Sequence, residues 1–180
     1  MKRLILFRHA KSGWEDAVSR DFDRPINARG RKGAHLMGEK LRDNGPGFDH
    51  VLASPAIRVV ETIEEFEKGF GHPVEPEWEK RIYLASCMTL LDVVHDADDQ
   101  YAAIMLVGHN PGLEDMVLML VPDDGKSPER DEIEEKLPTA AIVELTIDCD
   151  HWADIQPRSA RITRFMRPRD FDPALGPDHG

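Results

Sequence analysis

The sequence predicts an α/β protein with three layers, α/β/α, built around a mainly parallel central sheet in one domain. Two observations predict this fold class. Three short apolar segments, residues 3–7, 50–53 and 103–107, have the composition of buried strands. Each is followed by a stretch with helical periodicity, and strands that alternate with helices form a parallel sheet covered on both faces.

Length and composition agree with one globular domain. The chain has 180 residues, of which 41% are hydrophobic and 32% charged, and its net charge is −11. Because this negative charge repels nucleic acid and anionic membrane surfaces, neither is an expected partner. No apolar run approaches the ~20 residues that span a bilayer. With only two cysteines, far apart at Cys87 and Cys149, we expect a reduced, cytoplasmic protein.

The first two strands lead into predicted helices with clear boundaries. After a polar loop at residues 16–25, a helix is expected over residues 28–42, with Asn27 as its N-cap. After the second strand, Ser54 and Pro55 have the residue types of an N-cap and a first helical position. Gly69 is expected to end that second helix.

The third strand and the later elements follow the same logic. Asn110 and Pro111 begin a predicted helix that ends near Pro122, and residues 89–96 form another. Residues 140–147 and 161–165 are predicted strands, whereas the acidic segment 123–136 is a solvated loop or a short helix. We therefore expect a domain over residues 1–167 and a loosely ordered tail, rich in Pro, Gly and Asp, over residues 168–180.

Charged side chains follow each of the first three strands. Arg8 and His9 follow the first strand, Arg58 lies one turn into the second helix, and His109 follows the third strand. Ligands bind at the carboxyl edge of such sheets, where these groups would converge. Because a guanidinium group bonds two oxygens at once, two arginines and two histidines predict a site for a dianion such as phosphate.

Arg58 also has an ordinary interpretation. The dipole of a helix opposes a cation in its first turn by about 0.3–1 kcal/mol, whereas a bound anion reverses that effect. An exposed Arg58 that pairs with Glu61 or Glu65 explains the residue equally well. His9 and His109 could likewise be hydrogen-bonded structural residues. Neither belongs to a closely spaced ligand pair and the arginines repel divalent cations, so no metal site is expected.

Four motifs in order resemble one family. RHA near the N-terminus, SPxxR after the second strand and GHNP after the third resemble the histidine phosphatase superfamily, which has the phosphoglycerate mutase-like fold. The segments FRHAKSGW, DFDRPINARGRKGA, LASPAIRVVETIE and VGHNPGLE are similar to its SixA-type branch of phosphohistidine phosphatases. The resemblance covers residues 4 to about 120, and the late strands fit it.

The resemblance implies a mechanism. His9 attacks phosphorus and is phosphorylated, water then releases inorganic phosphate, and no metal or organic cofactor takes part. The phosphoryl oxygens are held by Arg8, Arg58 and His109. Weaker contacts to the substrate are expected from Lys11, Ser12 and Asn110.

The substrate that the sequence favours depends on whether a general acid is present. The segment at residues 82–86, where a monoester phosphatase of this family would carry one, has no carboxylate. General acid catalysis contributes typically ~10²–10⁴-fold, and phosphohistidine needs it least because its imidazole leaves easily. The favoured substrate is therefore a phosphorylated protein, such as a histidine phosphotransfer domain, reached through an open rim at residues 13–25 and 123–136.

Three other functions stay open. The first is a small-molecule or broad phosphomonoesterase that uses Glu77 or Glu79 as the acid. The second is a non-catalytic phosphate- or phosphoprotein-binding domain, and the third is a metal-dependent hydrolase.

Overall fold

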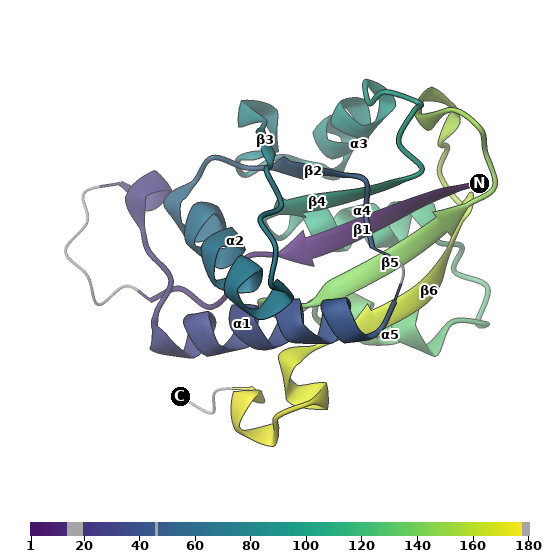
Figure 1. The fold of residues 1–180 in the computed structure, drawn as a ribbon. Coiled ribbons are helices and arrows are strands. Elements are labelled where there is room, and N and C mark those ends of the chain that lie inside the picture. Colours follow the sequence, from purple (N-terminus) through teal and green to yellow (C-terminus); the bar gives the residue numbers. More distant parts are fainter. Residues whose placement is uncertain (14–19, 46, 178–180) are drawn as a thin grey trace.

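The central sheet has six strands and confirms the predicted fold class (Figure 1). In this computed structural model, residues 1–13, 20–45 and 47–177 are described. The strand order is β3-β2-β4-β1-β5-β6, and neighbours among the first four run parallel while β5 and β6 are antiparallel to their neighbours. The strands are β1 (Lys2–Arg8), β2 (His50–Ala53), β3 (Glu77–Trp78), β4 (Ala103–Gly108), β5 (Ile142–Ile147) and β6 (Ala160–Met166).

Helices cover both faces of the sheet, which gives the three predicted layers (Figure 1). One face packs against α1 (Ala28–Asp43) and α2 (Ile57–Phe70). The other packs against α3 (Cys87–His95), α4 (Gly112–Leu120) and α5 (Pro128–Glu135). In β1, side chains alternate between the two cores, since Ile5 and Phe7 face α1 and α2 while Leu4 and Leu6 face the other layer.

Two helices begin one or two residues later than predicted. The helices begin at Ile57 and Gly112, so Pro55 and Pro111 precede them. Oδ1 of the predicted cap Asn110 still accepts a hydrogen bond from the Glu114 amide at 3.3 Å in the first turn of α4. The hydroxyl of Ser54 instead lies 2.8 Å from Nε2 of His109. The predicted cap of α1 is confirmed, because Oδ1 of Asn27 accepts a hydrogen bond from the Gly30 amide at 2.8 Å.

Gly69 does not end α2, which continues to Phe70 and closes on Gly71 at a left-handed φ of 87°. Gly69 instead allows α1 and α2 to approach closely. A Cβ added at Gly69 would lie 2.0 Å from the carbonyl oxygen of His35, and one at Gly38 would lie 2.1 Å from that of Phe66. Glycine is therefore required at both positions because the backbones of α1 and α2 are in contact there.

The acidic segment at residues 123–136 contains the helix α5. Of the two predictions for this segment, a solvated loop or a short helix, the second is confirmed. Ser127 caps α5 by accepting a hydrogen bond from the Arg130 amide at 3.2 Å, and buried Arg130 and Ile133 anchor the helix on the domain. Of the other rim segment, residues 14–19 lie outside the described residues.

The segment after β6 is more ordered than predicted. Residues Pro168–Asp170 and Pro173–Leu175 form 3-10 turns, each with Pro at its first positions. Pro168 is buried, and the Arg167 amide donates to the Asp170 carboxylate at 2.8 Å. The ammonium of Lys40 on α1 lies 5.1 Å from the Phe171 ring centroid. A domain boundary at residue 167 stays a prediction, and residues 178–180 lie outside the described residues.

Within the described residues, no helix is both long and apolar enough to cross a membrane.

Replacement of Gly38 by Ala should destabilise the fold, because the new methyl group would meet the backbone of Phe66. We expect a loss of about 1–3 kcal/mol in the free energy of unfolding, measured by urea denaturation. Gly47 is the control, since a Cβ there meets nothing within 4 Å and Gly47→Ala should change stability little. Equal effects of the two substitutions would contradict the close α1–α2 approach.

Candidate active site

Parallel strands bring the two histidines together. Arg8 of β1 is paired in register with Gly108 of β4, so His9 and His109 follow neighbouring strand ends. The amide of His9 donates to the Gly108 carbonyl at 3.1 Å, and the two imidazole centroids lie 5.4 Å apart. The strand ends therefore place both imidazoles at one point on the carboxyl edge.

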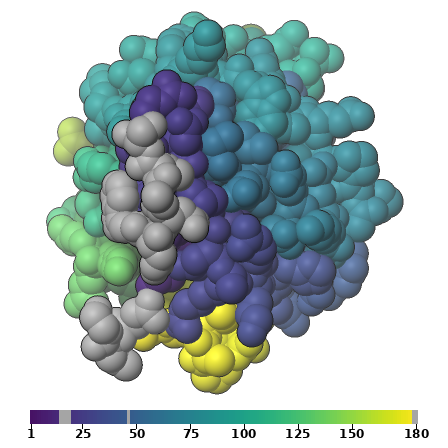
Figure 2. Space-filling view, turned by 90° about the vertical axis from the view of Figure 1, so that its left-hand side faces the viewer, coloured from purple at the N-terminus to yellow at the C-terminus, as the bar shows by residue number. Residues whose placement is uncertain are grey.

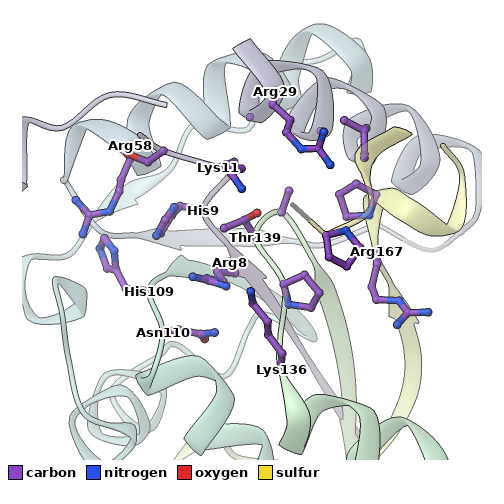
Figure 3. A pocket seen from close by; sticks show the side chains of 18 of the residues that line it. Arg8, His9, Lys11, Arg29, Arg58, His109, Asn110, Lys136, Thr139 and Arg167 are labelled. Carbon is purple, nitrogen blue, oxygen red and sulfur yellow. The ribbon is translucent and has the colours of Figure 1, made fainter. Parts of the chain in front are cut away.

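A cavity of about 490 Å³ lies at this edge (Figure 3). Its lining includes every site residue that the sequence indicated: Arg8, His9, Lys11, Ser12, Arg58, His109 and Asn110. The structure thus brings these residues together, while their catalytic roles stay predictions.

His9 is held as a neutral imidazole with a defined tautomer. Its Nδ1 lies 2.8 Å from the carbonyl oxygen of Ala10, and since a carbonyl only accepts, Nδ1 carries the hydrogen. Nε2 therefore keeps its lone pair. Burial lowers the pKa of His9 to about 3, and the nearby charges of Arg8 and Arg58 act in the same direction.

His109 is also neutral. Burial, followed by the charge of Arg58, lowers its pKa to about 3. Its Nε2 lies 2.8 Å from the hydroxyl of Ser54, whereas its Nδ1 is buried and has no hydrogen-bond partner in the part of the chain that the structure describes. If the Ser54 hydroxyl donates to Nε2, Nδ1 carries the hydrogen and is a donor.

Arg58 is buried and ion-paired, so its predicted alternative as an exposed partner of Glu61 or Glu65 is wrong. Only 2% of its surface is exposed, and its guanidinium donates to the carboxylate of Asp21 at 3.0 Å and to the Asp21 carbonyl at 2.9 Å. Glu61 instead accepts from the amide of Ile26. A buried cation needs a counter-charge, which Asp21 supplies.

Asp21 stays ionised in this arrangement. Partial burial raises the pKa of its carboxyl, but a hydrogen bond from the Tyr83 hydroxyl at 2.7 Å and the charge of Arg58 outweigh burial, and the pKa falls to about 2. Asp21 is the one carboxylate among the described residues that line the cavity. The sequence offered little sign of it, because Asp21 lies in a polar loop without periodicity.

Three buried donors at the site have no partner in the described part of the chain. They are Nε of Arg8, Nε of Arg58 and Nδ1 of His109. Buried polar atoms in folded proteins almost always form hydrogen bonds. Unsatisfied nitrogens on three cationic or imidazole side chains that line one cavity agree with a site for an oxyanion.

The weaker candidates have other partners. Ser12 donates to the Pro25 carbonyl at 2.7 Å and accepts from Arg24 at 2.7 Å, which fixes the loop beside the cavity. The amide nitrogen of Asn110 donates to the Leu137 carbonyl at 3.0 Å. Lys11 lines the cavity between His9 and Arg29 (Figure 3).

The two proposed acids do not line the cavity. Glu77 lies 2.8 Å from Nε2 of His50, and Glu79 forms an ion pair with Arg81 at 3.2 Å. Basic residues that the sequence analysis did not single out do line it, at positions Arg24, Arg29, Lys136, Arg167 and Arg169. Arg24 and Arg29 lie within the segment DFDRPINARGRKGA, to which no site role was given, whereas Lys136, Arg167 and Arg169 lie in late segments that no motif marked. Among the described residues, no three His, Cys, Asp or Glu side chains gather as metal ligands would.

Comparison with known proteins identifies the family of this chain. Residues 4–81 match the model of the histidine phosphatase superfamily (branch 1). An uncharacterized protein of Mycobacterium tuberculosis strain H37Rv is 34% identical over 163 residues, which are 90% of this chain and 99% of that protein. The chain belongs to the histidine phosphatase superfamily.

Solved structures agree with this assignment. A protein of Nakamurella multipartitia, provisionally described as the phosphohistidine phosphatase SixA, is 25% identical, with a TM-score of 0.80 over 93% of this chain and 96% of that one. A protein histidine phosphatase SixA solved with tungstate has the same fold at 19% identity, with a TM-score of 0.75 over 94% and 99% of the two chains. Together, the family and these neighbours support a phosphatase.

Both site histidines should stay neutral across the physiological range. In an NMR titration, we expect no protonation midpoint for His9 or His109 between about pH 5 and pH 8, because burial lowers both pKa values to about 3. His151 is the internal control, since its hydrogen bond to Asp99 raises its pKa. A midpoint near pH 6.5 for His9 would contradict the buried neutral state.

The same shifts fix how stability depends on pH. In the unfolded chain these histidines take up protons near their ordinary pKa of about 6.5. The unfolded state therefore binds more protons between pH 6.5 and pH 3, and the free energy of unfolding should fall as the pH is lowered through that window.

Proposed function

We propose that the protein is a phosphohistidine phosphatase, which hydrolyses phosphohistidine on a protein substrate through a phosphohistidine intermediate on His9. One observation carries the proposal. The bond from Nδ1 of His9 to the Ala10 carbonyl leaves a neutral imidazole with a nucleophilic Nε2, beside three buried nitrogens that lack a partner among the described residues. A nucleophile next to an oxyanion site is what phosphoryl transfer requires.

In the first step, the lone pair on Nε2 of His9 attacks phosphorus. The bond between phosphorus and the substrate imidazole breaks, and its electron pair returns to the leaving nitrogen. Arg8, Arg58 and His109 donate to the equatorial oxygens, whose charge spreads in the in-line transition state. The incoming dianion also raises the pKa of His109, which strengthens its donation.

In the second step, water attacks the phosphorus on His9. The bond to Nε2 breaks, inorganic phosphate leaves, and the imidazole returns to its neutral tautomer on the Ala10 carbonyl. In this proposal no metal or organic cofactor takes part, because the guanidinium groups neutralise the phosphoryl charge that a metal ion neutralises elsewhere.

The missing acid favours cleavage of a P–N bond. Asp21, the carboxylate that lines the cavity, has a pKa of about 2 and holds Arg58, so it has no proton to give. A leaving group must therefore depart without protonation by the enzyme. The imidazole of phosphohistidine can do so when its other ring nitrogen already carries a proton, because it then leaves as neutral imidazole, whereas an alkoxide is a far more basic leaving group.

Brief incubation with a phosphohistidine peptide should leave acid-labile phosphate on His9. We expect His9→Ala to abolish this label and turnover while phosphate binding persists in part. The label is located by mass spectrometry after a rapid quench, and a parallel reaction with EDTA should give the same yield. Unchanged turnover by His9→Ala would eliminate the covalent mechanism and favour a site that only binds phosphate or acts through a metal.

The leaving group should decide the rate. We expect kcat/KM for a phosphohistidine peptide to exceed that for an alkyl phosphate by about 10²-fold or more, the lower range of general acid catalysis. Glu77→Gln and Glu79→Gln should change neither rate, because neither side chain lines the cavity. A preference for the alkyl ester that disappears in Glu77→Gln or Glu79→Gln would support the phosphomonoesterase instead.

A further inference from the structure

The positive charge of the cavity extends well beyond His9. Its described lining has eight Lys and Arg side chains and one carboxylate, in a protein whose net charge is −11. Four of the eight, Arg8, Lys11, Arg24 and Arg58, come from the segments that form the phosphoryl site. The other four form what we call the distal basic cluster: Arg29, Lys136, Arg167 and Arg169.

The distal basic cluster is assembled from separate segments. Arg29 lies in the first turn of α1, Lys136 directly follows α5, and Arg167 and Arg169 follow β6. Figure 3 shows Arg29, Arg167 and Lys136 around the side of the pocket away from Arg58 and His109. The helix dipole opposes a cation at Arg29, and no acidic residue occupies that first turn. A bound anion would remove this opposition.

Part of the cluster lacks a counter-charge. Arg167 is held by Asp170 at 2.9 Å, and Arg29 donates to the Gly176 carbonyl. In contrast, Nε of Arg169 is buried with no hydrogen-bond partner, and no ion pair is formed by Arg169 or Lys136 in the described residues. Arg169 and Lys136 therefore add positive charge to this side of the cavity that no carboxylate among the described lining residues there offsets.

We propose that the distal basic cluster is a second anion subsite, and that the pocket also hydrolyses small phosphoanhydrides whose leaving group is itself an anion. The activity rests on the His9 chemistry proposed above, while the subsite is independent of it. The cavity volume of about 490 Å³ lies within the 300–1,000 Å³ range of pockets that enclose whole small ligands. A single phosphoryl group would fill only part of it.

The reaction balances without a co-reactant other than water. Nε2 of His9 attacks the terminal phosphorus, the P–O bond to the bridging oxygen breaks, and the electron pair stays on the leaving phosphate. Water then releases the terminal group from His9 as inorganic phosphate. Since a phosphate oxygen has a pKa of about 6, it leaves without a proton donor, which suits a site whose lining carboxylate is ionised. The distal basic cluster holds the charge that develops on it.

Binding to the non-turnover variant His9→Ala tests the subsite without chemistry. By isothermal titration calorimetry, inorganic tripolyphosphate should bind about tenfold or more tightly than orthophosphate, because it reaches both subsites. Adding Arg169→Ala and Lys136→Ala should reduce this advantage to about threefold or less. Arg161→Ala is the matched control, since Arg161 is an exposed cation on β6 outside the cavity lining and should leave the advantage intact.

Equal affinity for the two anions, or an advantage that survives loss of Arg169 and Lys136, would overturn the subsite. An equal loss in Arg161→Ala would overturn it too, since the effect would then be one of overall charge.

Turnover is tested separately. The unmodified protein should release orthophosphate from tripolyphosphate and carry acid-labile phosphate on His9. Tight binding without release would overturn the phosphoanhydride activity while leaving the subsite. Failure on phosphohistidine peptides alone would count against the protein substrate and not against the subsite.

Discussion

Burial of two guanidinium groups beside two imidazoles is the constraint on which the site depends. The carboxyl ends of β1, β2 and β4 place Arg8 and Arg58 at one edge of the sheet, where they lose water and repel each other. Asp21 supplies one counter-charge, and Tyr83 holds Asp21 by a hydrogen bond. Protonation of both imidazoles would place two more positive charges beside these guanidinium groups, at a high electrostatic cost. The imidazoles therefore remain neutral. Burial, together with the positive surroundings that would hold an anion, therefore keeps the imidazole of His9 neutral.

The contrast between an acidic protein and a basic cavity affects which molecules reach the site. A net charge of −11 repels extended polyanions, whereas a cavity lined by arginines and lysines concentrates positive potential at one point. Figure 2 shows the face to which α2 and the start of α1 contribute, turned by 90° from Figure 1. A small anion, or a single phosphorylated side chain, can enter this field without laying a long charged surface against the protein. Because salt screens such fields, association should weaken at high ionic strength.

The site was predictable where strand geometry alone determines it. The parallel neighbours β1 and β4 end at Arg8 and just before His109, and His9 follows Arg8. Once these two strands are assigned, the convergence of the three side chains can be predicted. Contacts between distant loops were not predictable. Arg58 pairs with a loop carboxylate 37 residues away, and Ser54 contacts His109 where its local sequence favoured a helix cap. The turns after β6 were missed for the same reason, since Pro and Gly composition does not reveal that Pro168 is buried.

Basicity of the leaving group connects the proposed activities. Neither phosphohistidine nor a phosphoanhydride needs a proton from the enzyme, and Asp21 is committed to Arg58 and has none to give. Selection between a phosphohistidine and a phosphoanhydride substrate would then depend on the residues that line the cavity. In the proposed reactions, the walls near His9 would meet the phosphoryl group, which both substrates share. Residues of the segment from Arg167 to Pro177 line the side of the cavity away from Arg58 and His109 (Figure 3), where they would meet the group to which the phosphoryl group is attached. On the proposed activities, the C-terminal segment would therefore contribute to substrate choice, while the ends of β1, β2 and β4 would supply the chemistry.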